Sequence, residues 1–94
     1  MTWFKNMHSK KYQVNLSKKA EKAFVKIRAD YRKLIQKSLL DISDDPYVGD
    51  VIKLKGEINT YRKRVGIYRI IYSIYQDIVY VEVLDISHRK DTYK

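Results

Sequence analysis

Three arginines, Arg62, Arg64 and Arg69, lie close together in a stretch whose polar and apolar residues alternate. The stretch covers residues 61–72 and reads YRKRVGIYRIIY, with Gly66 as the expected turn. Side chains alternate sides along a strand, so Arg62 and Arg64 point to the same side of the predicted sheet. Like charges on neighbouring strands repel, and a purely structural sheet face favours Thr or Val. We therefore expect an anion to bind over these arginines.

A second polar group follows the last strand-like run, in the ending SHRKDTYK. We expect its residues His88, Arg89 and Tyr93 to reach the same free face as the three arginines. Arginine presents a planar fork of donors that matches phosphate oxygens, and it does not practically act as an acid or base. Proton transfer therefore falls to His88, with an unperturbed pKa of about 6.5, or to Tyr93, whose pKa neighbouring cations lower. The sequence leaves this choice open.

The reaction that matches these residue types is RNA cleavage by the substrate's own 2′-hydroxyl. A base takes the hydroxyl proton, the oxygen attacks the adjacent phosphate, and the 5′-oxygen leaves. Arginines stabilise the extra negative charge, and loss of one such donor costs about 10²–10³ in rate. The reaction needs no metal and no cofactor, and DNA lacks the nucleophile. The predicted catalytic residues are Arg62, Arg64, Arg69, His88, Arg89 and Tyr93.

Each candidate also has a purely structural interpretation. Arg62 could pair with an acid such as Glu82, and His88 could be a surface residue at a strand end. Tyr68 and Tyr72 could pack in the core, although stacking on RNA bases is also open to them, to Tyr61 and to Tyr93. The set of residues is more specific than any one member, but it depends on the register of the sheet.

The charge of the chain points to a polyanionic partner. The formal net charge is +9, from 20 basic and 11 acidic residues. Residues 38–52 carry four acids and no base, whereas residues 53–69 carry six bases and one acid. Such segregation gives a directional field, which favours nucleic acid as the partner over a membrane. The predicted RNA-binding lysines are Lys18, Lys22, Lys26, Lys53, Lys55 and Lys63; those at 18, 22 and 26 belong to a stripe that is either simply solvated or contacts phosphates.

Composition excludes several classes of site. The chain has no cysteine, which rules out disulfides, thiolate metal ligands and cysteine nucleophiles, and favours the cytoplasm as its location. Its two histidines lie eighty residues apart, at positions 8 and 88, so a metal site is not expected. No apolar run approaches the length of a membrane span, and no membrane partner is expected.

The elements that would position these residues start with a short strand over residues 12–16 and an N-cap at Ser17. Apolar residues then recur at helical spacing from Ala20 to Ile42. This spacing is compatible with one long helix. We favour a helical hairpin with a turn at residues 29–30, in which Asp30 caps the second helix. The helix is expected to end around residues 43–46, before a loop.

The remaining residues read as strands. Residues 51–56 form a short apolar-basic run, residues 61–65 and 68–75 form a hairpin, and residues 78–86 form a central strand. We predict an α+β fold with an N-terminal strand, a helical hairpin and then an antiparallel sheet of about four strands. Residues 1–11 are predicted to be a flexible tail and residues 12–94 a single domain. The helices would cover one sheet face and leave the other free.

The sequence LKG at residues 54–56, the run YRKRVGIYRIIY and the ending HRKDTY together resemble the RelE/ParE toxin superfamily. The ending resembles the RelE branch in particular. The resemblance implies a microbial-ribonuclease-like fold and a type II toxin that cuts messenger RNA in the ribosomal A site and so inhibits translation. It also implies a cognate RelB-like antitoxin that blocks the basic groove, and a complex that reaches operator DNA through the antitoxin.

The superfamily's functional positions fall on the same residues. Two alternate basic residues of the hairpin, usually lysines in RelE-like toxins, correspond to Arg62 and Arg64. The arginine of the GxYR segment corresponds to Arg69, and the C-terminal motif contributes Arg89 and Tyr93. Arginine in place of lysine removes a proton donor, so we expect the histidine that precedes Arg89 to compensate.

Two other functions compete with this hypothesis. A ParE-type toxin shares the fold and the GxYR hairpin, but it poisons DNA gyrase without being an enzyme. A plain RNA-binding module would bind RNA in a salt-dependent manner without cleavage. The intact HRKDTY ending favours the endoribonuclease.

Overall fold

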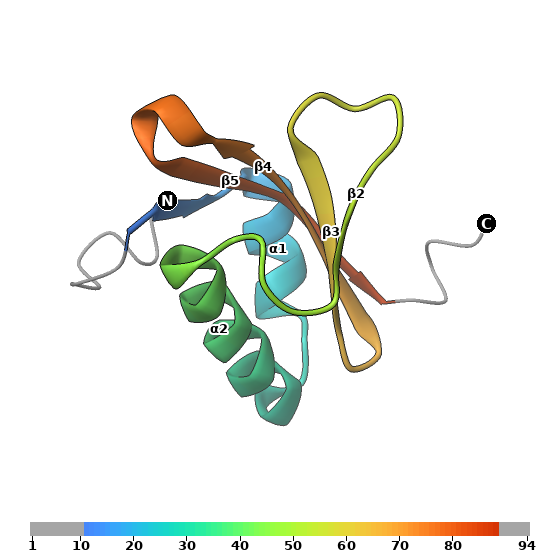
Figure 1. Ribbon diagram of the computed structural model, residues 1–94. Coiled ribbons are helices and arrows are strands. Elements are labelled where there is room, and N and C mark those ends of the chain that lie inside the picture. The colour runs from blue at the N-terminus through green and yellow to red at the C-terminus, as the bar shows by residue number, and fades with distance from the viewer. Residues whose placement is uncertain (1–10, 89–94) are drawn as a thin grey trace.

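The computed structural model of the protein describes residues 11–88, and Figure 1 shows how their elements are arranged. The elements follow the predicted α+β order. They are β1 (Gln13–Leu16), α1 (Lys18–Val25), α2 (Ala29–Asp44), β2 (Val51–Lys53), β3 (Thr60–Val65), β4 (Tyr68–Tyr75), the 3₁₀ turn η1 (Gln76–Ile78) and β5 (Tyr80–His88).

The strands form one five-stranded sheet in the order β1-β5-β4-β3-β2. Strands β2 to β5 pair antiparallel, as predicted, and β1 adds a fifth strand that runs parallel to β5. The last strand begins two residues later than predicted, because η1 and Val79 form the turn that precedes it. Strand β5 lies between β1 and β4, which explains its largely apolar sequence.

Both helices pack on the same face of the sheet, which we call the helix face (Figure 1). Alternate residues of β4, such as Ile70, Tyr72 and Ile74, point to this side and are almost completely buried. They join one core with residues of all the long elements: Val14, Leu16, Ala20, Phe24, Ile27, Ile35, Leu39, Ile42, Val65, Val81, Val83 and Ile86. The arrangement confirms that the helices cover a single side of the sheet.

The helical region is a hairpin, as predicted, but the chain turns earlier than expected. Helix α1 starts after Ser17, whose hydroxyl accepts a hydrogen bond from the amide of Ala20 at 3.1 Å. The break falls at residues 26–28, and Arg28 precedes α2 without a capping side chain. Asp30 therefore lies inside the first turn of α2 and is not its cap. Arg32 donates to the carbonyl of Val25, the last residue of α1, at 3.4 Å, and to that of Ile27 in the break at 2.7 Å.

The β3–β4 hairpin has the predicted turn. Gly66 adopts a positive φ of 59° at the first of two turn residues, where type II′ hairpins require glycine. The register then pairs Arg64 with Arg69 and Val65 with Tyr68. This register fixes which side chains share a face of the sheet.

Candidate functional site

Three arginines lie together on the sheet face opposite the helices, and we call this surface of β3 and β4 the arginine face. Arg64 and Arg69 are direct partners across the two strands, and Arg62 is the next residue of β3 on the same side. The side chain of Arg62 is only 10% exposed, whereas that of Arg64 is 38% exposed. The predicted clustering of the three arginines on one face is therefore confirmed.

One carboxylate sits beside two of these arginines. Oδ1 of Asp50 lies 3.3 Å from Nη2 of Arg62, and Oδ2 lies 3.7 Å from Nε of Arg64. The acid suggested as a partner from the sequence, Glu82, is engaged elsewhere, because it accepts hydrogen bonds from Asn15 and Tyr80. Sequence reasoning missed Asp50, since only the β2–β3 pairing brings it next to the arginines.

The arginines retain donor capacity that Asp50 does not use. The Nε atoms of Arg62 and Arg64 are buried and have no hydrogen-bond acceptor among residues 11–88. Buried donors of this kind usually have a partner, and a missing one commonly indicates an ion or ligand. Within residues 11–88 the carboxylate of Asp50 contacts Arg62 and Arg64 without accepting a hydrogen bond from these Nε donors, so the arginine face is suited to receive an anion.

The structure separates His88 from the arginines. In the β4–β5 register His88 pairs with Tyr68, on the same parity as the buried residue Ile86. Its imidazole makes an edge contact with the ring of Tyr68, with 5.5 Å between the centroids. The expectation that His88 joins the arginine face is therefore wrong for this structure. The reason is that successive side chains of a strand point to opposite faces, so the pairing of His88 with Tyr68 places the imidazole on the helix face.

The tyrosines of the hairpin are packing residues. Tyr72 is completely buried, and its hydroxyl donates to the carbonyl of Pro46 at 2.8 Å. Tyr61 stacks on Tyr72, and Tyr68 makes an edge contact with Tyr31 of α2. Tyr61, Tyr68 and Tyr72 thus lie on the helix face, away from the arginines, and the core-packing interpretation is confirmed for Tyr68 and Tyr72.

Lys63 also points away from the arginines. It is 8% exposed and lines a cavity of about 350 Å³ below the end of α2, together with Asp41, Asp44 and Asp45 among others. Burial lowers the pKa of Lys63, and nearby Asp41 only partly opposes that change. A side chain held in this position cannot contact RNA on the arginine face, which corrects the prediction for Lys63.

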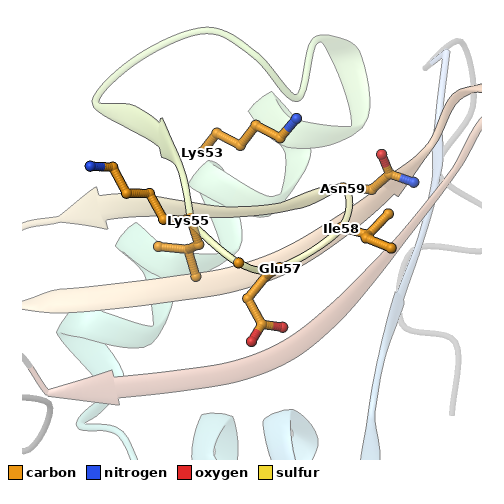
Figure 2. A pocket seen from close by; sticks show the side chains of 7 residues that line it. Lys53, Lys55, Glu57, Ile58 and Asn59 are labelled. Atoms are coloured by element: carbon orange, nitrogen blue, oxygen red, sulfur yellow. The ribbon is translucent and has the colours of Figure 1, made fainter.

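Lys53 and Lys55 lie on β2 and in the β2–β3 loop, and both are exposed. The loop borders an open surface pocket of about 610 Å³ lined by residues 53–59, and no arginine contributes to it. Figure 2 shows that the two lysine side chains extend in different directions from the loop. They can therefore extend a positive surface, but they do not form a single binding point.

The remaining predicted residues fall into two groups. Lys18 and Lys22 are exposed on α1, and Lys26 is exposed directly after it, so all three lie in the helical layer and do not belong to the arginine face. Arg89 and Tyr93 lie outside the described residues.

The described part of the chain offers no metal site and no membrane span. Residues 11–88 contain no group of three or more His, Cys, Asp or Glu side chains that could hold a metal ion. Neither α1 nor α2 is long and apolar enough to cross a bilayer.

The fold is similar to that of several solved toxins. A chain of the archaeal RelE–RelB complex from Pyrococcus horikoshii OT3 is 27% identical, with 84% of this chain and 96% of that chain covered and a TM-score of 0.76. A chain of the toxin–antitoxin complex RelBE2 from Mycobacterium tuberculosis is 25% identical, with 83% and 98% covered and a TM-score of 0.71. The intact Escherichia coli RelBE complex, at 22% identity, 82% and 95% coverage and a TM-score of 0.72, shows the same fold.

The family comparison agrees with these structures. A comparison with curated protein sequences gives no match. The family described as the ParE toxin of the type II toxin–antitoxin system parDE matches residues 14–93, which include the arginine hairpin and the ending HRKDTY. The protein therefore belongs to the ParE toxin family, within the RelE/ParE superfamily, and is the toxin of a type II toxin–antitoxin system.

Proposed function

We propose that this toxin is a metal-independent endoribonuclease that cuts messenger RNA in the ribosomal A site and so stops translation. The observation that carries the proposal is the arginine face, where Arg62, Arg64 and Arg69 converge on adjacent strands and Asp50 faces the first two of them. Such a cluster suits a phosphodiester whose negative charge increases in the transition state. The similarity to RelE structures supports RNA as the molecule that supplies this phosphodiester.

In the proposed reaction the arginines hold and polarise the scissile phosphate. The substrate's 2′-oxygen loses its proton and forms a bond to phosphorus, while the bond from phosphorus to the 5′-oxygen breaks. The leaving oxygen takes up a proton. The products are a 2′,3′-cyclic phosphate and a 5′-hydroxyl, so atoms and charge balance without a cofactor. Arginine remains protonated throughout, because its pKa is above about 12.

Proton transfer is assigned to Tyr93, with Arg89 as a further phosphate contact. Both assignments follow from the C-terminal motif that the chain shares with RelE-like toxins. His88 was the other candidate, but its imidazole lies against Tyr68 on the helix face. Lys53 and Lys55 would guide the flanking RNA, because they lie on the strand and loop that precede β3.

The proposed partners are the translating ribosome, its message and a RelB-like antitoxin, with the cytoplasm as the location. The similar solved toxins are complexes with RelB-type antitoxins. An antitoxin that covers the arginine face would block phosphate binding, and the complex would reach operator DNA through the antitoxin.

A second candidate is inhibition of DNA gyrase without catalysis. The match to the ParE toxin family favours it, since such toxins share this hairpin. Under this alternative the arginine face would serve as a contact surface or as scaffold, and message would remain intact.

The experiment that tests the proposal adds purified protein to a translating extract and maps the 5′ ends of the message by primer extension. Cuts within A-site codons that disappear with Arg69→Ala are the expected result. Intact message, together with blocked supercoiling by purified gyrase, would overturn the endoribonuclease and support the alternative. Naked RNA is a poor substrate for this test, because toxins of this kind show little activity without the ribosome.

A further inference from the structure

Asp50 is the one acid that contacts the candidate site within the described residues 11–88. It lies directly before β2, and its carboxylate faces Arg62 at 3.3 Å and Arg64 at 3.7 Å. Its backbone carbonyl also accepts a hydrogen bond from the amide of Arg64 at 3.0 Å. Main chain and side chain thus hold Asp50 against β3.

The loop that carries Asp50 is fixed by the core. The carbonyl of Pro46 accepts a hydrogen bond from the buried hydroxyl of Tyr72. Gly49 adopts a φ of 103°, a conformation that favours glycine, and its carbonyl accepts from the amide of Val51 at 2.8 Å. The carboxylate is therefore presented to the arginines by the fold itself, in the absence of any ligand.

Exposure and distance show that this carboxylate can be exchanged. The side chain of Asp50 is 54% exposed, whereas the side chain of Arg62 beneath it is 10% exposed. Tight charged hydrogen bonds measure about 2.7–2.9 Å, so contacts of 3.3 and 3.7 Å are loose. A half-exposed ion pair of this kind contributes little to stability. An incoming anion with better geometry can replace it at low cost.

We propose that Asp50 is an internal counter-ion that occupies the position of a substrate phosphate on Arg62 and Arg64 and is displaced when RNA binds. The inference rests on the proposed function, because it takes RNA phosphate as the incoming anion. In the free toxin Asp50 relieves repulsion among the arginines. In the complex it competes with the phosphate, so it lowers the affinity of the site for RNA.

The direct test measures binding of a fluorescent 2′-O-methyl RNA oligonucleotide, which lacks the nucleophile and cannot be cut. Asp50→Asn should bind about threefold to tenfold more tightly than the wild type at low salt. Asp50→Glu, which keeps the charge, should bind like the wild type. Circular dichroism melting checks that each variant is folded, and the Glu variant keeps the test informative if the Asn variant is unstable.

The matched control is Asp77→Asn, which removes the same charge from η1. The η1 turn follows Tyr75, at the other end of β4 from Arg69. The change in affinity caused by Asp77→Asn therefore measures only the effect of net charge. Affinity of Asp50→Asn equal to that of Asp77→Asn, or weaker than that of the wild type, would overturn the inference and leave the proposed function standing. Failure of the wild type itself to bind the oligonucleotide would overturn the inference, whereas the primer-extension test in translating extract decides the proposed function separately.

Discussion

Arg62 and Lys63 are neighbours on β3, each only 8% exposed, yet they lie in opposite surroundings. Among residues 11–88, Arg62 lies beside Arg64 and Arg69 and contacts the carboxylate of Asp50. Lys63 borders a cavity with three aspartates at the end of α2. Positive charge is in excess on the first side and negative charge on the second. Burial of a basic residue therefore does not identify an anion site, whereas the balance of charge around it does.

The same alternation separates chemistry from stability along β4. Arg69 lies on the arginine face, and the next residue, Ile70, is completely buried in the core. Substitutions at successive positions should thus affect different properties.

The largest effect is expected for Arg69→Ala. It removes a donor to the phosphate, and message cleavage in a translating extract should fall by about 10²–10³. The free energy of unfolding should change by no more than about 0.5 kcal/mol, because a like-charged neighbour of Arg64 is lost. Denaturant unfolding and primer extension measure the two properties. Full cleavage by this variant would remove Arg69 from the site.

Ile70→Ala should lower the stability of the protein and leave its cleavage activity nearly unchanged. Removing a fully buried side chain leaves a cavity, and the free energy of unfolding should fall by about 2–5 kcal/mol. Cleavage per folded molecule should remain within about threefold, since the arginine face keeps its residues. Assays below the melting temperature of the variant make this comparison. A large loss of activity in the folded variant would show that the two faces are coupled.

Lys63→Met should stabilise the protein, by about 1 kcal/mol at neutral pH, because a methionine fills the site without a buried charge. The lowered pKa of Lys63 means that the unfolded chain binds this proton more strongly than the folded chain does. Between that lowered pKa and the usual 10.5, the free energy of unfolding of the wild type increases as pH rises. The difference in stability between Lys63→Met and the wild type should therefore become smaller over this range.

Arg62→Met is the matched control for the same strand. It should weaken binding of the 2′-O-methyl oligonucleotide, whereas Lys63→Met should leave that binding unchanged. Equal weakening by both variants would mean that RNA reaches the helix face, and the division of β3 into two faces would be wrong.

The smallest effect is expected for His88→Gln. Because the imidazole contacts Tyr68 and not the arginines, cleavage should fall by less than about threefold and its pH profile should keep its shape. Tyr93→Phe is the comparison, and it should cost at least about tenfold. If only His88→Gln abolishes the rise or the fall of the cleavage rate with pH, the proton-transfer residue is His88 and not Tyr93.

The sequence alone determined the local elements and the pairing of the hairpin. Alternation through residues 61–72 and the glycine at 66 predicted that Arg62, Arg64 and Arg69 share a face, because a tight turn dictates register over a few residues. Ser17 as a cap and the helical apolar spacing likewise predicted α1 and α2, apart from the break at residues 26–28.

Only the tertiary structure decided which distant residues meet at this face. His88 is placed by the β4–β5 register, which contains an irregularity near residues 71–72 that no local pattern indicates. Asp50 reaches the arginines through the pairing of β2 with β3 and the anchoring of its loop by Tyr72. Such contacts depend on packing between segments far apart in sequence. The alternation of a strand predicts the sheet face on which a side chain lies, whereas packing determines which charged residues surround it there.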